Sequence, residues 1–209
     1  MSTLLYIESS PRKERSTSIK IAQEFLEVFR AHNTDCNITT LDLWSMNLPE
    51  FTDERINAKY KVLHGKEHSP QEKEAWDEVS HFVDGFKAAD YYLFSLPMWN
   101  FSIPYKLKHF IDIITQPGLT FSYSPETGYQ GLVTGKPCTV IYSRGGEYAS
   151  EQTAPLDYQK TYFEFLLSFI GFTNIQSIIL DGTLGAPEVK ETNIASAMAQ
   201  AKTIAQSMR

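Results

Sequence analysis

Hydroxyl side chains gather close behind the first apolar run of the sequence, residues 4–7. Ser10 lies just after this run, and Ser16, Thr17 and Ser18 open a pattern of apolar residues at helical spacing. Backbone N–H groups at the start of a helix can surround a phosphate, and neighbouring hydroxyl groups can complete the shell. The spacing therefore predicts an anion site at this strand end, with an ordinary capped helix as the alternative.

The loop between these hydroxyl groups is basic, since it contains Arg12, Lys13 and Arg15. Any of the three cations can add charge to an anion site, and the sequence leaves open which one does. No G-x-G-x-x-G pattern follows this strand, which argues against a standard dinucleotide site. A phosphate site in this loop would therefore differ from the standard dinucleotide type.

A second group of residues offers flat apolar surface. Met98, Trp99, Asn100 and Phe101 follow the apolar run 91–96 and lie between two prolines. Two aromatic rings, a thioether and one amide suit a planar aromatic ligand. A local hydrophobic corner with Asn100 in a turn is the alternative interpretation.

A third group follows the apolar run 139–142 and consists of Ser143, Arg144, Gly145 and Gly146. Glycine pairs are common in turns, but a backbone without side chains also lets a flat ring approach closely. Cys138 and Arg144 have the spacing of a phosphatase loop, which we reject because the residues between them read as a strand. At ~3.3 Å per residue a strand holds its ends far apart.

Metal chemistry is not expected from this sequence. His64 and His68 are four residues apart, but Gly65 interrupts the helix that would align them and no third ligand is evident. We therefore predict no metal site.

The intervening segments predict an α/β fold. Short apolar runs at 4–7, 37–41, 91–96, 139–142 and 175–180 alternate with helical patterns at 16–29, 53–63, 69–86, 104–114, 155–170 and 187–208. A small hairpin is expected within 119–131. This alternation is typical of a doubly wound, five-stranded parallel sheet with helices on both faces. With strand order 2-1-3-4-5, the carboxyl ends of strands one, three and four are neighbours, so all three groups would border one crevice.

Composition limits the remaining function classes. The chain has 209 residues with a formal charge of −6, which predicts one domain over 1–209 and no nucleic-acid or anionic-membrane partner. No 18-residue apolar span or signal-peptide pattern occurs, and Cys36 and Cys138 are too few for a disulfide framework. We expect a cytoplasmic protein.

These motifs together resemble the FMN-dependent NADH azoreductases, also described as NADH:quinone oxidoreductases, of the flavodoxin-like superfamily. The resemblance covers essentially the whole chain, and the stretch that begins at Pro97 is its most specific part. It implies that FMN binds to the three groups defined above. The residues implied at the phosphate are Ser10, Ser16, Thr17 and Ser18. The residues implied around the ring are those of the second and third groups: Met98, Trp99, Asn100, Phe101, Ser143, Arg144, Gly145 and Gly146. It also implies a homodimer with the flavin near the subunit interface. Trp99 stands where tyrosine is common in the family.

The implied activity is two-electron, ping-pong transfer from NADH to a quinone, azo or nitroaromatic acceptor, with NADPH as an open second donor. Because the cofactor supplies the chemistry, no catalytic side chain is expected. Phe121, Tyr123 and Phe163 are expected to border the substrate. The alternatives are a flavodoxin-type electron carrier, an FAD-dependent quinone reductase of the same fold, and a regulatory domain that kept only the fold.

Overall fold

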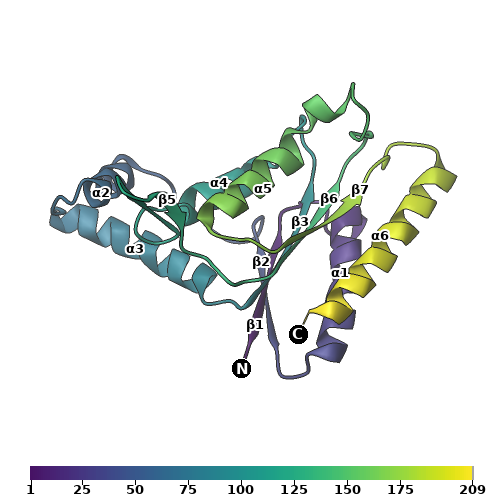
Figure 1. Ribbon diagram of the computed structural model, residues 1–209, viewed down its shortest axis with the longest axis horizontal. Coiled ribbons are helices and arrows are strands. Elements are labelled where there is room, and N and C mark those ends of the chain that lie inside the picture. Colours follow the sequence, from purple (N-terminus) through teal and green to yellow (C-terminus); the bar gives the residue numbers. More distant parts are fainter. Residues whose placement is uncertain (209) are drawn as a thin grey trace.

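A five-stranded parallel sheet forms the centre of the computed structural model, which describes residues 1–208 (Figure 1). The strands are β1 (Thr3–Glu8), β2 (Asn37–Asp42), β3 (Tyr91–Pro97), β6 (Cys138–Ser143) and β7 (Ile175–Leu180). Their order is β2-β1-β3-β6-β7, and every neighbouring pair is parallel. Counted within this sheet alone, the order is 2-1-3-4-5, so the predicted topology is confirmed.

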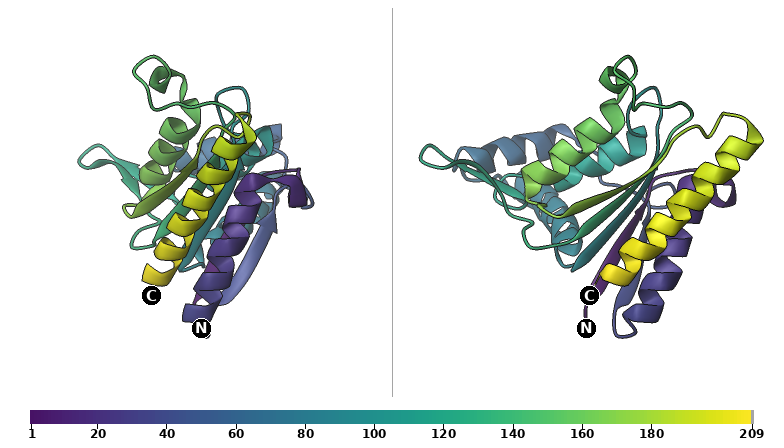
Figure 2. Two further views of the ribbon diagram at one scale, coloured as in Figure 1. Left: turned by 90° about the vertical axis from the view of Figure 1, so that its right-hand side faces the viewer. Right: turned by 45° about the vertical axis from the view of Figure 1, so that its right-hand side comes forward.

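Helices cover both faces of the sheet, as predicted. They are α1 (Thr17–His32), α2 (Asp53–Leu63), α3 (Pro70–Lys87), α4 (Tyr105–Ile114), α5 (Tyr158–Ile170) and α6 (Pro187–Ser207). The first and last of these, α1 and α6, lie side by side on one face, while α3, α4 and α5 lie on the other (Figures 1 and 2). Each connection therefore returns the chain to the amino end of the next strand, and the carboxyl ends all meet at one edge.

The central strand β3 is buried on both faces, which explains its unbroken apolar sequence. Tyr92, Phe94 and Leu96 face the core beneath α3, α4 and α5, whereas Leu93 faces the core beneath α1 and α6. Two separate hydrophobic cores thus hold the sheet in place, and the end of β3 is rigidly positioned between them.

Local capping fixes where two of the helices begin. Ser16 is the N-cap of α1, because its side chain accepts a hydrogen bond from the N–H of Ile19. The start of α3 is a capping box: Ser69 Oγ accepts from the N–H of Glu72, and the Glu72 carboxylate accepts from the N–H of Ser69. These polar signals agree with the predicted starts.

The helix predicted over residues 155–170 is wrong at its start. A short 3₁₀ turn (Ala154–Leu156) comes first, and α5 begins only at Tyr158. Asp157 between them has non-helical dihedral angles, and its side chain accepts from the N–H of Lys160 at 2.9 Å. An N-cap residue has non-helical dihedral angles, so Asp157 separates the 3₁₀ turn from α5. Helix propensity alone does not predict this break.

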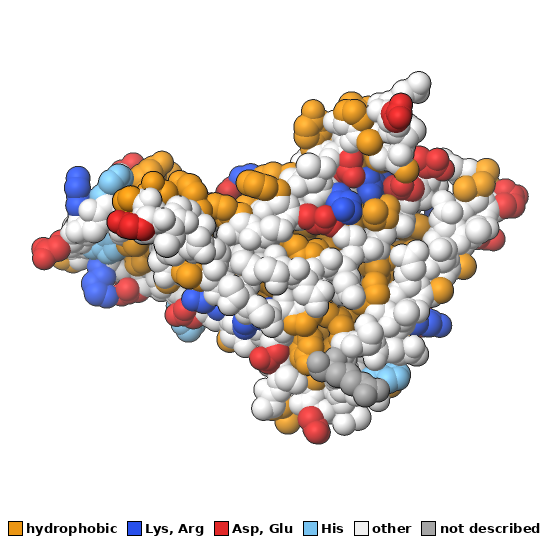
Figure 3. All heavy atoms as spheres, viewed as in Figure 1, with side chains coloured by type: hydrophobic (Ala, Val, Ile, Leu, Met, Phe, Trp, Pro, Cys, Tyr) orange, Lys and Arg blue, Asp and Glu red, His pale blue; other side chains and the backbone are white. Residues whose placement is uncertain are grey.

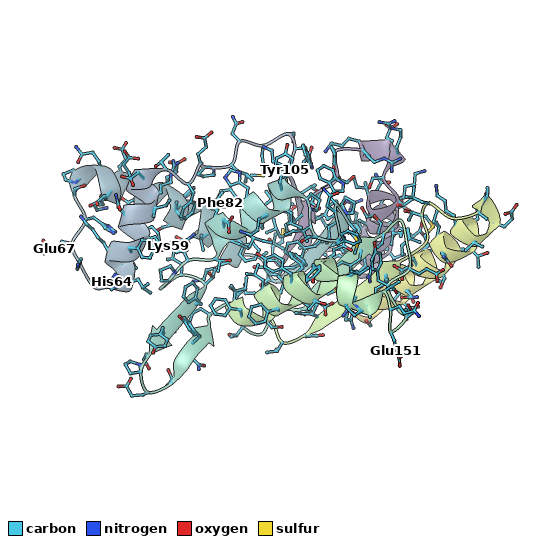
Figure 4. The ribbon with its side chains drawn as sticks, turned by 90° about the horizontal axis from the view of Figure 1, so that it is seen from above. Lys59, His64, Glu67, Phe82, Tyr105 and Glu151 are labelled. Atoms are coloured by element: carbon cyan, nitrogen blue, oxygen red, sulfur yellow. The ribbon has the colours of Figure 1, made fainter. Side chains whose placement is uncertain are left out.

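The predicted hairpin consists of β4 (Phe121–Ser124) and β5 (Gly128–Gly131), which pair antiparallel and project from the body of the molecule (Figure 4). Its base is tied to the end of α5, since the N–H of Val133 donates to the carbonyl of Ile170 at 2.8 Å. A Cβ on Gly131 would lie 2.3 Å from the nitrogen of Gly171, so this close approach requires glycine.

The outer surface is concave between α2 and the segment 144–157, and hydrophobic side chains gather along this concave edge (Figure 3). Within residues 1–208, no helix combines the length and the apolar character needed to cross a bilayer.

Candidate functional site

The three groups predicted from the sequence meet at the carboxyl edge of the sheet. The N–H and Oγ of Ser9 both donate to the carbonyl of Ser95, at 3.2 and 2.8 Å, which joins the ends of β1 and β3. The N–H of Met98 donates to the carbonyl of Ser143 at 2.8 Å, which joins the ends of β3 and β6. Backbone hydrogen bonds therefore hold the three loops against one another.

A cavity of about 280 Å³ lies between these loops, and we call it the cation-lined cavity. It brings together most of the predicted site residues, with contributions from all three groups: Ser10, Ser16, Thr17, Met98, Trp99, Ser143 and Gly145. Further lining residues come from the predicted basic loop, from the end of β3, from the segment between β7 and α6 and from the first turn of α6: Arg12, Arg15, Pro97, Thr183, Leu184 and Lys190.

Positive charge dominates this cavity although the chain as a whole carries −6. Arg12, Arg15 and Lys190 are its charged lining residues, and within residues 1–208 no carboxylate lines it. Cations beside the amino end of a long helix favour an anionic ligand. The cavity is therefore built to bind an anion.

Lys13, the third cation of the basic loop, is directed elsewhere. Its ammonium pairs with Glu8 at 2.7 Å and with Asp42 at 2.5 Å. Burial alone would raise the pKa of Asp42, but hydrogen bonds from Lys13, Ser45 and the Trp44 N–H hold that pKa below its usual range. Of the three cations in the basic loop, Arg12 and Arg15 line the cation-lined cavity and Lys13 does not.

The hydroxyl groups differ in their positions. Ser16 Oγ lies 3.1 Å from Ser18 Oγ, and Ser18 is fully buried behind it, outside the cavity lining. Ser10 Oγ accepts from the N–H of Arg12 at 3.4 Å. Ser10, Ser16 and Thr17 are consequently the hydroxyl residues of the first group that line the cation-lined cavity.

The stretch after β3 forms a tight turn with unusual dihedral angles. Trp99 and Ser102 exchange two backbone hydrogen bonds, at 2.8 and 3.0 Å, across a turn whose central residues are Asn100 and Phe101. Both have positive φ, +47° and +68°, a conformation that costs non-glycine residues about 1–3 kcal/mol each. Among the residues that the structure describes, the N–H groups of Asn100 and Phe101 have no hydrogen-bond acceptor. This strained turn therefore presents two free donors at the sheet edge.

Trp99 belongs to an aromatic cluster that the sequence did not reveal. Its ring centroid lies 5.7 Å from that of Trp44 and 6.2 Å from that of Tyr105, and Trp44 and Tyr105 are 5.3 Å apart. The indole N–H of Trp44 donates to the carbonyl of Ser9 at 2.9 Å. Trp44 and Tyr105 come from other segments of the chain, so only the fold could show that they support Trp99.

A second cavity, of about 480 Å³, lies on the other side of Trp99, and we call it the aromatic cavity. Its lining combines aromatic, polar and charged side chains: Trp99, Asn100, Ser102, Ile103, Tyr105, Lys108 and Tyr162. Burial raises the pKa of Tyr162, so its hydroxyl stays protonated and can donate at neutral pH. Trp99 is thus shared by the two cavities.

Phe121, Tyr123 and Phe163, which were expected to border the substrate, do not line the aromatic cavity. Phe163 is buried in the core, with its ring 5.1 Å from that of Phe94. Phe121 and Tyr123 are on the projecting hairpin. Tyr162, one position before Phe163 on α5, lines the aromatic cavity instead, because neighbouring helical residues point about 100° apart.

Arg144 was expected at the ring but turns its side chain away from the cavity. The guanidinium is buried and pairs with Asp157 at 2.6 Å and with Asp181 at 3.2 Å, beside the ring of Tyr148. Burial raises the pKa of Asp181, and the charge of Arg144 opposes this shift. The Arg144 side chain therefore joins the loop after β6 to the start of α5 and the end of β7.

The two glycines of this loop also make structural contacts. A Cβ on Gly145 would lie 2.8 Å from Cδ1 of Leu184, so its small size lets the two loops approach. The carbonyl of Gly146 accepts from the N–H of Gly182 at 3.2 Å, and Gly146 does not line the cavity. Whether these residues contact a cofactor stays a prediction.

The residues present fit FMN, the cofactor expected from the resemblance. The phosphate requires cations, hydroxyls and helix N–H groups, which the cation-lined cavity combines. The flat ring system requires apolar surface and donors for its polar edge. Met98, Trp99 and Leu184 offer the surface, and the turn at Asn100 and Phe101 offers the donors.

Comparison with known proteins identifies the family of this chain. The profile of a protein family described as a flavodoxin-like fold matches residues 2–205. A Desulfotalea psychrophila protein named FMN-dependent NADH:quinone oxidoreductase is 55% identical over 208 residues, which cover 100% of this chain and 98% of that protein.

Solved structures show the same architecture. The structure of an azoreductase from Bacillus anthracis str. Sterne superposes with a TM-score of 0.90 at 27% identity and covers 100% of both chains. An FMN-dependent NADH-azoreductase from Bacillus anthracis str. Ames Ancestor, solved in complex with FMN, has a TM-score of 0.84 at 29% identity over 98% of this chain and 100% of that one. The chain therefore belongs to the family of flavodoxin-like proteins that includes the FMN-dependent NADH:quinone oxidoreductases.

Proposed function

We propose that this protein is an FMN-dependent NADH:quinone oxidoreductase that also reduces aromatic azo compounds. For a quinone, the balanced reaction is NADH plus a proton plus quinone, giving NAD⁺ and hydroquinone. The observation that carries the proposal is the junction at Trp99 of an anion-binding cavity and an aromatic cavity. Family membership, with 55% identity to a relative of that name, supports it.

The chain's own residues hold and orient the cofactor. Arg12, Arg15 and Lys190, with the first N–H groups of α1, would bind the phosphate. The N–H groups of Asn100 and Phe101 would bind the polar edge of the ring. Bound FMN supplies the carrier chemistry, since it takes up a hydride equivalent from NADH and passes two electrons to the acceptor.

Substrates would use the aromatic cavity in turn. Trp99, Tyr105 and Tyr162 offer flat contact to a nicotinamide or an aromatic acceptor, and this single cavity next to Trp99 serves both. Donor product would leave before the acceptor enters, which predicts ping-pong kinetics. No side chain is needed as a proton donor, because water can protonate the product.

The activity is tested with purified protein loaded with FMN. We expect the released flavin to be FMN, with steady oxidation of NADH by menadione or an azo dye and parallel lines in double-reciprocal plots. NADPH is measured in the same assay, because no residue described above selects between the donors. Failure to bind flavin would contradict the proposal, and so would a requirement for both substrates bound at once.

The alternatives give different results in the same experiment. A flavodoxin-type electron carrier would be reduced slowly by NADH and would need a partner protein for turnover. An FAD-dependent reductase would release FAD. A regulatory domain would be colourless and would bind neither flavin.

We propose in addition a homodimer that acts in the cytoplasm. Aromatic residues on β5 and α5 form a continuous surface, in which the half-buried Phe169 lies 5.5 Å from the exposed Tyr129 and 6.5 Å from the exposed Phe165. A second copy would cover this surface. Light scattering should give a dimer that Phe165→Glu weakens, while Tyr60→Glu, on an exposed part of α2, leaves it intact.

The proposed cytoplasmic location is supported by the cysteines. Cys36 and Cys138 are free thiols, which suits a reducing compartment such as the cytoplasm.

A further inference from the structure

The aromatic cavity contains one charged side chain among its lining residues, Lys108 on α4. Three aromatic residues (Trp99, Tyr105 and Tyr162) line the same cavity, and Asn100, Ser102 and Ile103 are its other lining residues. A cavity of about 480 Å³ has the size of a site for one or two fused rings. A neutral quinone would need no cation at this position, so the ammonium requires an explanation.

The surroundings of Lys108 leave its charge available. Its ammonium pairs with Asp112, one turn further along α4, at 2.6 and 2.8 Å, and both side chains are about half exposed (48% each). Exposed pairs of this kind contribute only about 0–1 kcal/mol. A ligand anion can therefore replace Asp112 as the partner of Lys108 at little cost.

A second lysine reinforces the positive charge. Lys59 on α2 reaches towards α4, where its ammonium donates to the carbonyl of Thr115 at 3.4 Å. Burial lowers the pKa of Lys59, while the charge of Asp112 raises it and that of Lys108 lowers it further. Lys59 thus adds a second cation beside α4, where Lys108 pairs with Asp112.

We propose that the aromatic cavity selects acceptors that are aromatic anions, that is, planar quinones or azo compounds bearing a sulfonate or carboxylate. Lys108 pairs with the anionic group while Trp99, Tyr105 and Tyr162 contact the rings. The inference rests on the proposed oxidoreductase function and adds the residue that makes the cavity favour anionic over neutral acceptors. Lys108 is a specificity-determining residue, and it takes no part in the electron transfer itself.

The test compares two matched acceptors on the FMN-loaded enzyme: 1,4-naphthoquinone and its 2-sulfonate. The quantity measured is the ratio of kcat/KM for the anionic acceptor to kcat/KM for the neutral one, because this ratio cancels changes common to both. Lys108→Met should lower the ratio about fivefold, the loss of one partly exposed ion pair. Asp112→Asn should raise the ratio, because it removes the competing carboxylate and its repulsion.

Lys106→Met is the matched control, since Lys106 is on the same helix but does not line the aromatic cavity. Its ratio should equal that of the wild type. The inference is overturned if Lys108→Met leaves the ratio unchanged, if Asp112→Asn moves it in the same direction as Lys108→Met, or if Lys106→Met matches Lys108→Met.

One further measurement separates acceptor recognition from recognition of the anionic donor. Stopped-flow reduction of the bound flavin by NADH reports the donor half-reaction alone. If Lys108→Met slows this step as strongly as it slows the sulfonate, the lysine serves NADH and the inference is wrong. A wild-type enzyme that fails to reduce even the neutral quinone would contradict the proposed function instead.

Discussion

The two cavities on either side of Trp99 are built from different parts of the fold. The cation-lined cavity is assembled mainly from loops at strand ends, and hydroxyl residues and cations make up much of its lining. The aromatic cavity is assembled from the turn after β3 and from side chains of α4 and α5. Loop backbone held by the sheet suits a cofactor that never changes, whereas side chains on helix surfaces can vary with the acceptor.

Trp99 forms the boundary between the cavities, and it opens the strained turn of Asn100 and Phe101. Strain of this kind persists only where the surroundings enforce it, and here β3 on one side and the aromatic cluster of Trp44, Trp99 and Tyr105 on the other do so. The comparison implies that mutations in the loops should change cofactor binding, while mutations beyond the turn should change acceptor choice.

The largest effect is expected from Arg144→Met. The substitution leaves the carboxylates of Asp157 and Asp181 without their buried partner, so the free energy of unfolding should fall by about 3–5 kcal/mol. FMN affinity should fall as well, because Gly145 and Leu184 lose their support. Urea unfolding and FMN fluorescence titration measure the two quantities, and Arg144→Lys should restore part of each. Unchanged stability would show that the ion pairs do not hold the loop.

A smaller and more selective effect is expected from Arg15→Ala and Lys190→Ala. Each variant should bind FMN about tenfold more weakly, the loss of one charge-assisted contact, while its affinity for riboflavin, which lacks the phosphate, changes little. Lys13→Ala is the control, because Lys13 pairs with Glu8 and Asp42. This variant should leave the ratio of FMN affinity to riboflavin affinity unchanged. Equal losses for both flavins would place the phosphate elsewhere.

Trp99→Tyr tests the boundary itself. We expect the variant to retain FMN and to change the relative kcat/KM of quinone and azo acceptors a few-fold, because the smaller ring widens the aromatic cavity. Steady-state assays with one acceptor of each class provide the measurement. Loss of FMN from this variant would mean that the ring of the cofactor has been misplaced.

The smallest effect concerns acid stability near the cation-lined cavity. The pKa of Asp42 is lowered in the folded protein, so its ion pair stabilises the fold above the usual pKa near 3.8 and is lost as the pH falls through the lowered value. Asp42→Asn should remove less than about 1 kcal/mol at pH 7, and the loss should shrink as the pH falls below 3.8 and through the lowered pKa of Asp42. Unfolding curves at several pH values measure this, and a loss that stays constant as the pH falls would contradict it.

Patterns within the sequence predicted much of the architecture. The apolar runs marked every strand of the sheet to within one or two residues, and hydroxyl residues marked the start of α1. The start of α5 was missed because Asp157 serves both as a cap and as the partner of Arg144, a contact between distant segments. The sequence did not indicate that Lys190 lines the cation-lined cavity. Lys190 follows β7 closely, but nothing local in the sequence relates the first turn of α6 to the basic loop.

The sequence by itself determined which residue types follow each strand, and therefore that hydroxyls, aromatics and a glycine pair meet at one edge of a parallel sheet. Hydrophobic periodicity marks the strands and the helices between them, and parallel strands joined in this way have their carboxyl ends at the same edge of the sheet. Only the tertiary structure decided that Lys13 and Arg144 turn away from the cavity, that Trp44 and Tyr105 support Trp99, and that Lys108 lines a second cavity. Side-chain direction depends on partners distant in the chain, and those partners become neighbours only when the two cores are packed.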